Sequence, residues 1–226
     1  MDKLLAGVAR FQRDVFPQQQ ANFHGLVSGP QRPLVLFITC SDSRVVPSLI
    51  TQTDPGDLFG CQVVGNIVPA FGATYGGVSA TIEYAVSVLE IRHIIICGHS
   101  DCAAIKVLLD PSAVADLPSL RSWLDHAEAA RRTVQDNKQA DITDTELVDV
   151  MTRQNVVSQL TNLRTHPSVA SRLAGHKLEL HGWVYTIDTG EVRVYQEATG
   201  AFISASELSP SPETTGTTGT TNTDPA

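Results

Sequence analysis

Two short, uninterrupted runs of apolar residues constrain the fold of this 226-residue chain more than any other feature. The first covers residues 33–39 (PLVLFIT) and the second covers residues 93–97 (HIIIC). Neither run alternates polar with apolar side chains, so each predicts a strand that is buried on both faces. A weaker strand at 57–64 and a helix at 74–89 separate them. Strands that alternate with helices favour a parallel sheet with right-handed crossover connections.

The rest of the chain completes an α/β fold class. Apolar spacing predicts helices at 3–15, 117–137 and 144–165, with Pro17 limiting the first and a capping box of Thr143 and Glu146 opening the last. Two alternating segments, 181–186 and 191–196, predict a hairpin. The expected architecture is a central, mostly parallel sheet of four strands plus a C-terminal antiparallel edge strand, flanked by helices.

Three regions follow along the chain. Residues 1–30 are expected to form a projecting helical arm, whose apolar stripe needs a burial partner, with a neighbouring subunit as one candidate. Residues 31–208 form the main domain. Residues 209–226 lack aliphatic and aromatic side chains other than alanine, and their Ser/Thr/Pro/Gly-rich composition predicts a disordered polar tail.

Composition excludes several classes of protein. The formal net charge is -8, from 16 basic and 24 acidic side chains, and no basic stripe is present, which argues against nucleic acid as a partner. No apolar run approaches the roughly 18–20 residues that span a membrane, and residues 1–10 do not resemble a signal peptide. The four cysteines are too few for a secreted disulfide scaffold. We therefore expect a cytoplasmic protein with free thiols.

A metal-ligating residue type ends each apolar run. Cys40 follows the first run, and His99 and Cys102 follow the second. Functional groups collect at the carboxyl ends of parallel strands, so the three side chains are expected to meet. Two thiolates and an imidazole favour zinc, and three ligands leave a fourth position open for catalysis. Each residue alone is a weak candidate, because a buried cysteine often serves only as a small apolar residue. Cys61 and Cys97 are interpreted as such structural thiols.

Asp42 and Arg44 lie two and four residues beyond Cys40. Alternate residues of an extended turn point the same way, which allows a bidentate ion pair. Beside a metal, Asp42 would either fill the open coordination position or accept a hydrogen bond from hydroxide on the metal, with Arg44 holding it oriented. Without a metal, the same pair is an ordinary loop salt bridge.

Taken together, these motifs resemble the signature of the β-class carbonic anhydrases. The resemblance extends from about residue 11 to 196 and is closest to bacterial enzymes linked to cyanate metabolism and to cyanobacterial carboxysomal enzymes. It is carried by residues 40–44 (CSDSR), 51–59 (TQTDPGDLF), 65–69 (GNIVP), 76–80 (GGVSA), 82–85 (IEYA), 99–102 (HSDC) and 180–185 (LHGWVY).

The resemblance implies reversible hydration of carbon dioxide to bicarbonate and a proton, with one Zn²⁺ per subunit. Zinc-bound hydroxide would attack carbon dioxide while Asp42, held by Arg44, orients it. The family's substrate pocket maps onto Gln31, Phe59, Val64 and Tyr84. The resemblance also implies a homodimer or a larger even-numbered assembly, from tetramer to octamer, and adds the carboxysome as a second candidate location.

Two departures from the family pattern leave other functions open. Gln62 replaces a usual arginine, and Ala103 replaces a usual glycine, where its methyl group is expected to crowd the pocket or to oppose a positive φ. Phe37 and Gln62 also predict that no inhibitory bicarbonate site is present. The alternatives are a weakly active or non-catalytic zinc-binding relative that acts in assembly, and a hydrolase of carbon disulfide or carbonyl sulfide on the same scaffold.

Overall fold

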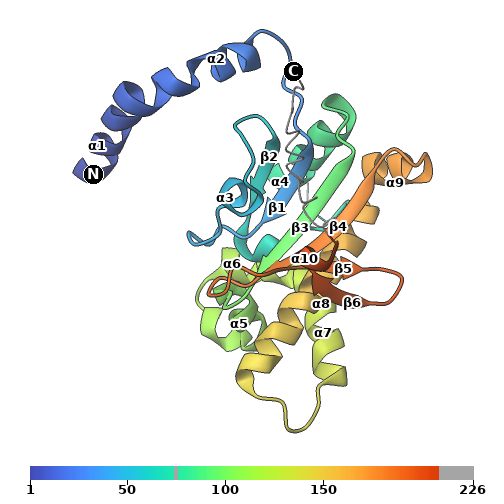
Figure 1. Cartoon of the computed structure of the whole chain (residues 1–226). Helices are drawn as coiled ribbons and strands as arrows, with labels where there is room; N and C mark the ends of the chain where they lie inside the picture. The colour runs from blue at the N-terminus through green and yellow to red at the C-terminus, as the bar shows by residue number, and fades with distance from the viewer. Residues whose placement is uncertain (74–75, 209–226) are drawn as a thin grey trace, which may run out of the picture.

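A six-stranded sheet with the strand order β2-β1-β3-β4-β5-β6 forms the centre of the computed structural model, which describes residues 1–73 and 76–208 (Figure 1). The first four strands in this order are parallel, and the last two are antiparallel. The strands are β1 (Val35–Thr39), β2 (Leu58–Gln62), β3 (His93–His99), β4 (Glu179–Tyr185), β5 (Val192–Gln196) and β6 (Ala201–Ser204).

The predicted fold class is confirmed, with one strand more at the antiparallel edge. The additional strand is β6, which pairs with β5. It follows a turn at Gly200, whose φ of 71° lies in the left-handed region that glycine adopts readily. Four residues are too few to establish an alternating pattern, so the sequence carries no signal for this strand.

Helices cover the sheet and form the lower part of the molecule in Figure 1. The α-helices of the body are α3 (Pro47–Thr51), α4 (Gly77–Glu83), α5 (Ala103–Leu109), α6 (Pro118–Leu124), α7 (Glu128–Asn137), α8 (Asp144–Arg164), α9 (Pro167–Ala174) and α10 (Ala205–Leu208). Shorter 3₁₀ or π segments are η2 (Val64–Asn66), η3 (Tyr84–Val88), η4 (Pro111–Val114) and η5 (Asp125–Ala127). The helix predicted at 117–137 is therefore divided into α6, η5 and α7.

The predicted capping box opens α8. The Glu146 amide donates to Thr143 Oγ1 at 3.3 Å, and the Thr143 amide donates to the Glu146 carboxylate at 3.0 Å. Both bonds satisfy amide groups that have no partner within the first turn of a helix. The start of the longest helix was thus predicted to the residue.

Two glycines allow α8 to approach the sheet closely. Gly98 lies in β3 and Gly182 in β4, and a Cβ atom at either position would lie 2.9 Å from a methyl group of Val156. At Gly182 it would also lie 3.0 Å from Leu160 and 3.2 Å from Tyr195. The helix can lie directly on the two central strands only because these positions carry no side chain.

Replacing Gly182 with alanine is expected to lower the free energy of unfolding by about 1–3 kcal/mol, because the added methyl group overpacks this contact. Gly60→Ala is the matched control, since a Cβ at that position in β2 meets no atom within 4 Å. Urea unfolding of the two variants measures the difference. Equal midpoints in both variants would contradict the close packing of α8 on β4.

The N-terminal arm is longer than predicted. α1 (Asp2–Arg10) continues through a π segment, η1 (Phe11–Val15), into α2 (Phe16–Val27), so the expectation that Pro17 ends the helix was wrong. Pro17 lies in the first turn of α2, where its missing N–H is no loss. The arm extends away from the sheet in Figure 1, and no residue of its three segments is buried.

The apolar stripe of the arm is exposed to solvent. It consists of Leu4, Leu5, Val8, Phe11 and Val15, which are between 43% and 67% exposed. No helix within the described residues is long and apolar enough to cross a membrane. The predicted tail, 209–226, lies outside the described residues, and the division of the chain at residues 30 and 208 stays a prediction.

Candidate metal centre

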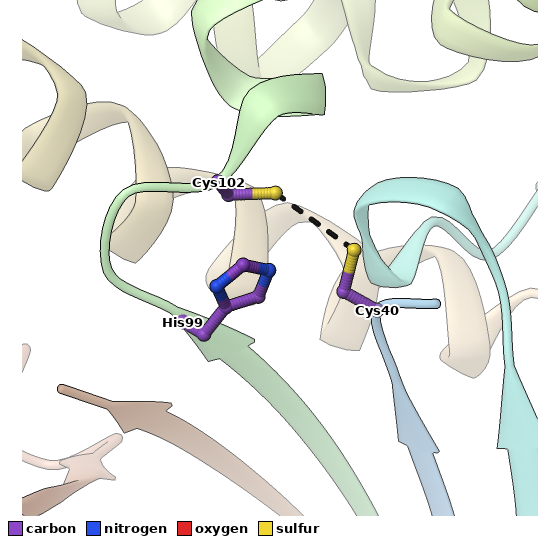
Figure 2. Close-up of side chains that lie close together, drawn as sticks. All are labelled: Cys40, His99 and Cys102. Carbon is purple, nitrogen blue, oxygen red and sulfur yellow. Dashed lines mark hydrogen bonds between the residues drawn. The ribbon is translucent and has the colours of Figure 1, made fainter. Parts of the chain in front are cut away.

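The sheet register brings the two predicted motifs to one edge. Thr39, the last residue of β1, lies opposite Cys97 of β3. Cys40 directly follows β1 and His99 is the last residue of β3, so both lie at the carboxyl ends of adjacent strands. Cys102 ends the turn after β3 and precedes the first residue of α5. The side chains of Cys40, His99 and Cys102 come together at this edge, as Figure 2 shows.

These three residues offer a compact set of buried ligands. The sulfur atoms of Cys40 and Cys102 are 3.9 Å apart, and the three potential ligand atoms lie within 4.8 Å of one another. Two zinc–sulfur bonds of about 2.3 Å at a tetrahedral angle place the sulfurs about 3.8 Å apart. The residues are 5%, 0% and 1% exposed in chain order, so the site is shielded from bulk water.

His99 provides an independent test of whether a metal fits. Its Nδ1 donates to the carbonyl oxygen of Ser100 at 2.8 Å, which requires the proton to be on Nδ1 because a carbonyl only accepts. Its Nε2 is therefore a free acceptor, and it is buried with no hydrogen-bond partner in the described part of the chain. A buried, unpartnered nitrogen is costly unless it binds a ligand. An imidazole and two thiolates suit zinc, and three ligands leave a fourth position open.

The cysteines differ in their acidity. Cys40 Sγ interacts with Cys102 and accepts a hydrogen bond from the Gly65 amide at 3.3 Å, and these contacts lower the pKa of its thiol. Burial raises the pKa of the Cys97 thiol to about 12 and also raises that of Cys61. Cys40 and burial raise the pKa of the Cys102 thiol, so this close pair shares one proton, with the thiolate on Cys40. Thiolate is the form that binds metal, so the second thiolate forms as a cation binds between the two sulfurs.

Asp42 and Arg44 form a bidentate pair beside the ligands. Arg44 Nε and Nη2 donate to the two carboxylate oxygens of Asp42 at 2.9 and 2.8 Å, and the Arg44 amide adds a third bond at 2.9 Å. These bonds hold the pKa of Asp42 well below its usual range. Asp42 Oδ2 lies 3.8 Å from His99 Nε2, so the ionised carboxylate faces the ligand cluster.

A further residue of this cluster escaped the sequence reasoning. Asp101 accepts a bond from Arg44 Nη1 at 2.9 Å and pairs with Lys106, which together lower its pKa to about 2. Arg44 thus joins the loop after β1 to the loop after β3. Asp101 is the residue of this loop with a positive φ, 56°. Ala103 is the first residue of α5 and has no positive φ. The expected opposition of Ala103 to a positive φ was therefore wrong, because the strained position is two residues earlier.

The turn beside Cys40 is held in place by buried amides from α8. Asn155 Nδ2 donates to the Gly65 carbonyl at 3.0 Å, and the Val68 amide donates to Gln159 Oε1 at 2.9 Å. Gln159 Nε2 in turn donates to Asn155 Oδ1 at 2.9 Å. Polar residues spaced four apart on a helix face are a detectable signal, but nothing in the sequence says which loop they contact.

The four predicted pocket residues do not form one group around the three ligands. Val64 precedes Gly65 in the turn beside Cys40, and its carbonyl accepts a bond from Trp123 at 2.8 Å. Phe59 and Tyr84 stack with ring centroids 5.9 Å apart. Within the described residues, no hydrogen bond, ion pair or ring contact links Gln31, Phe59 or Tyr84 to the three ligands. Gln31 precedes β1, at the end of that strand opposite Cys40.

The fold and the site together define an α/β protein with a buried Cys–His–Cys group that could hold a metal ion, at the carboxyl edge of a parallel sheet. The sequence model of the carbonic anhydrase family matches residues 35–192. A carbonic anhydrase of Pseudomonas aeruginosa is 45% identical over 207 residues, which cover 92% of this chain and 93% of that protein.

Solved structures agree with this match. The structure of the β-carbonic anhydrase CcaA has a TM-score of 0.87 and 44% identity, and the match covers 90% of this chain and 98% of that one. A tetrameric β-carbonic anhydrase of Sordaria macrospora has a TM-score of 0.69 and 30% identity over 85% of this chain and 92% of its own. The chain belongs to the β-class carbonic anhydrases. Its reaction is the reversible hydration of carbon dioxide.

Proposed function

We propose that hydration of carbon dioxide takes place at Cys40, His99 and Cys102, with one zinc ion held by these residues in each subunit. The observation that supports this most strongly is the buried Nε2 of His99, which has no hydrogen-bond partner among the described residues and lies beside two sulfur atoms. Zinc supplies a Lewis acid that lowers the pKa of bound water to about 7.

Asp42 orients the attacking oxygen in this proposal. Its ionised carboxylate accepts the hydrogen bond of that oxygen, which aims a lone pair at the carbon of the substrate. Arg44 keeps both oxygens of Asp42 engaged, and this favours the orienting role over direct occupation of the fourth ligand position. Asp101 and Lys106 hold Arg44 in turn.

The wall of the pocket is completed by a second subunit. Gln31, Phe59 and Tyr84 lie away from the ligands of their own chain, and Tyr84 is 43% exposed, so these side chains are free to face a partner's site. Apolar and aromatic walls suit carbon dioxide, which has no net dipole, while the amide of Gln31 supplies a hydrogen bond to the substrate. Val64, in the turn beside Cys40, would line the pocket from within the same chain.

The exposed arm supports a homodimer or a larger even-numbered assembly. An apolar stripe with no buried residue needs a surface to cover it, and a second copy of the chain offers one. The related Sordaria protein is tetrameric. The cytoplasmic or carboxysomal location stays a prediction.

The double variant Leu5→Glu/Val8→Glu is expected to shift the monomer–oligomer equilibrium towards the monomer, because two charges would be buried against the partner subunit. Its hydration activity should fall at least about tenfold. Light scattering after size-exclusion chromatography measures the mass. The control is the double variant Gln19→Glu/Gln20→Glu, at two exposed positions of the same arm. An unchanged assembly in the Leu5/Val8 variant would contradict the role of the arm.

Metal analysis and a stopped-flow hydration assay of the full chain test the proposal as a whole. We expect one zinc per subunit and rapid hydration. A zinc-loaded but inactive protein would instead indicate the non-catalytic relative. Turnover of carbon disulfide or carbonyl sulfide, in place of carbon dioxide, would indicate the hydrolase.

A further inference from the structure

A second group of potential metal ligands lies at the other end of the sheet. His93 is the first residue of β3, and Glu179 and His181 are the first and third residues of β4. His93 pairs with Glu179 in the parallel register, and side chains two apart on a strand share a face, so all three project from the same face. His99 is the last residue of β3, and the six steps between the two histidines correspond to about 20 Å.

The donor atoms of this group converge. His93 Nδ1 lies 3.2 Å from His181 Nε2, and the two nitrogens lie 3.8 and 3.9 Å from Glu179 Oε2. Two metal–nitrogen bonds of about 2.05 Å that meet at an angle of about 100° give the same nitrogen–nitrogen separation. The rings are tilted by 42°, so they are not stacked face to face.

A hydrogen bond between the two rings accounts for the distance of 3.2 Å by itself. It does not account for the carboxylate oxygen that is nearly equidistant from both nitrogens. A shared cation accounts for both observations, since it needs three donors around one point. The carboxylate completes the group by moving towards the nitrogens, which its exposure allows.

The surroundings permit a metal to enter and to bind. The side chains of His93, Glu179 and His181 are 46%, 70% and 32% exposed, so the group opens to solvent. Burial and the neighbouring His93 lower the pKa of His181, which keeps its ring in the neutral form that ligates metals. The Glu179 carboxylate contributes the negative charge.

We propose that His93, Glu179 and His181 form a second metal site, separate from the catalytic centre, for one divalent transition-metal ion. Two imidazoles and one carboxylate suit zinc, nickel or copper rather than magnesium or calcium, which prefer oxygen ligands alone. Three protein donors on an open surface leave the remaining positions to water. This second site uses none of the residues proposed for catalysis, and it does not depend on the function proposed for Cys40, His99 and Cys102.

Calorimetric titration of the zinc-loaded full chain with nickel ions tests the site. We expect one nickel per subunit to bind while the zinc content, measured in the same sample, stays at its starting value. His93→Gln and His181→Gln should each weaken nickel binding at least about tenfold, the loss that follows even when a supporting partner of a metal ligand is removed. His24→Gln, at an exposed histidine of the arm, is the matched control and should bind nickel as the parent does.

The carbon dioxide hydration rate of each variant shows that it is folded, because the group lies far from the catalytic ligands. His93 is half-exposed and tolerates substitution even if the more buried His181 does not. The proposal is overturned if the parent binds no nickel beyond its zinc. It is also overturned if His93→Gln binds nickel as tightly as the parent and the His24 control.

Discussion

Cys40→Ser is expected to lose most of its zinc and to hydrate carbon dioxide at least about a thousandfold more slowly than the parent, because the metal that activates water is no longer held. A serine hydroxyl is a poor zinc ligand next to a thiolate, and the remaining His99 and Cys102 cannot close a tetrahedral site. Metal content by mass spectrometry and stopped-flow hydration measure the two effects together.

Cys61→Ser is the matched control for this result. Cys61 is also a buried cysteine, 8% exposed, on the strand next to β1, but within the described residues it belongs to no group of three potential metal ligands. Burial raises the pKa of its thiol. This variant should keep its zinc and most of its activity. Full zinc occupancy in Cys40→Ser would show that the ligand assignment is incorrect.

Asp42→Asn has the second large expected effect. The variant should keep its zinc but lose about 10²–10³-fold in the rate of hydration, the usual cost of removing one positioned hydrogen-bonding group beside the reacting atoms. An amide of the same size retains the packing of the loop but removes the charge and one acceptor. Stopped-flow assays on zinc-matched samples separate this loss from loss of metal.

Neighbouring variants should produce a graded series. Arg44→Lys removes the planar fork that grips both oxygens of Asp42, so an intermediate loss is expected. Asp101→Asn weakens the ion pairs of Asp101 with Arg44 and Lys106, neither of which touches the reacting oxygen, and should cost less than about tenfold, since exposed ion pairs contribute little. An Asp101→Asn variant that is slower than Asp42→Asn would contradict the proposal that Asp42 orients the attacking oxygen while Asp101 only holds Arg44.

The clustering of Cys40, His99 and Cys102 was predictable because these residues lie at the ends of buried strands or just after them. Apolar runs reveal parallel strands, and parallel strands place their carboxyl ends at one edge, so Cys40 and His99 could be paired across 59 residues of chain. The bidentate contact of Asp42 with Arg44 also follows from local spacing. Both inferences need only the pattern of apolar residues along the chain and the short distance between residues two apart in sequence.

Other features depend on contacts that local spacing does not encode. The amides of α8 that hold the turn beside Cys40, and the pair of Arg44 with Asp101, join segments through tertiary packing alone. The continuation of the arm past Pro17 depends on a π segment that no propensity signals. His93 and His181, 88 residues apart, meet only once the register of β3 and β4 is known.

The close packing of α8 on Gly98 and Gly182 limits the motions of the enzyme near its active site. The same helix packs against the two central strands and, through Asn155 and Gln159, holds the turn at Gly65 and Val68. Opening of that turn breaks buried hydrogen bonds to a helix that stays packed on the sheet, so we expect its local unfolding to be costly in free energy. Where many enzymes close a mobile loop over the active site, this one anchors the turn beside Cys40 to a helix that packs directly on the central strands.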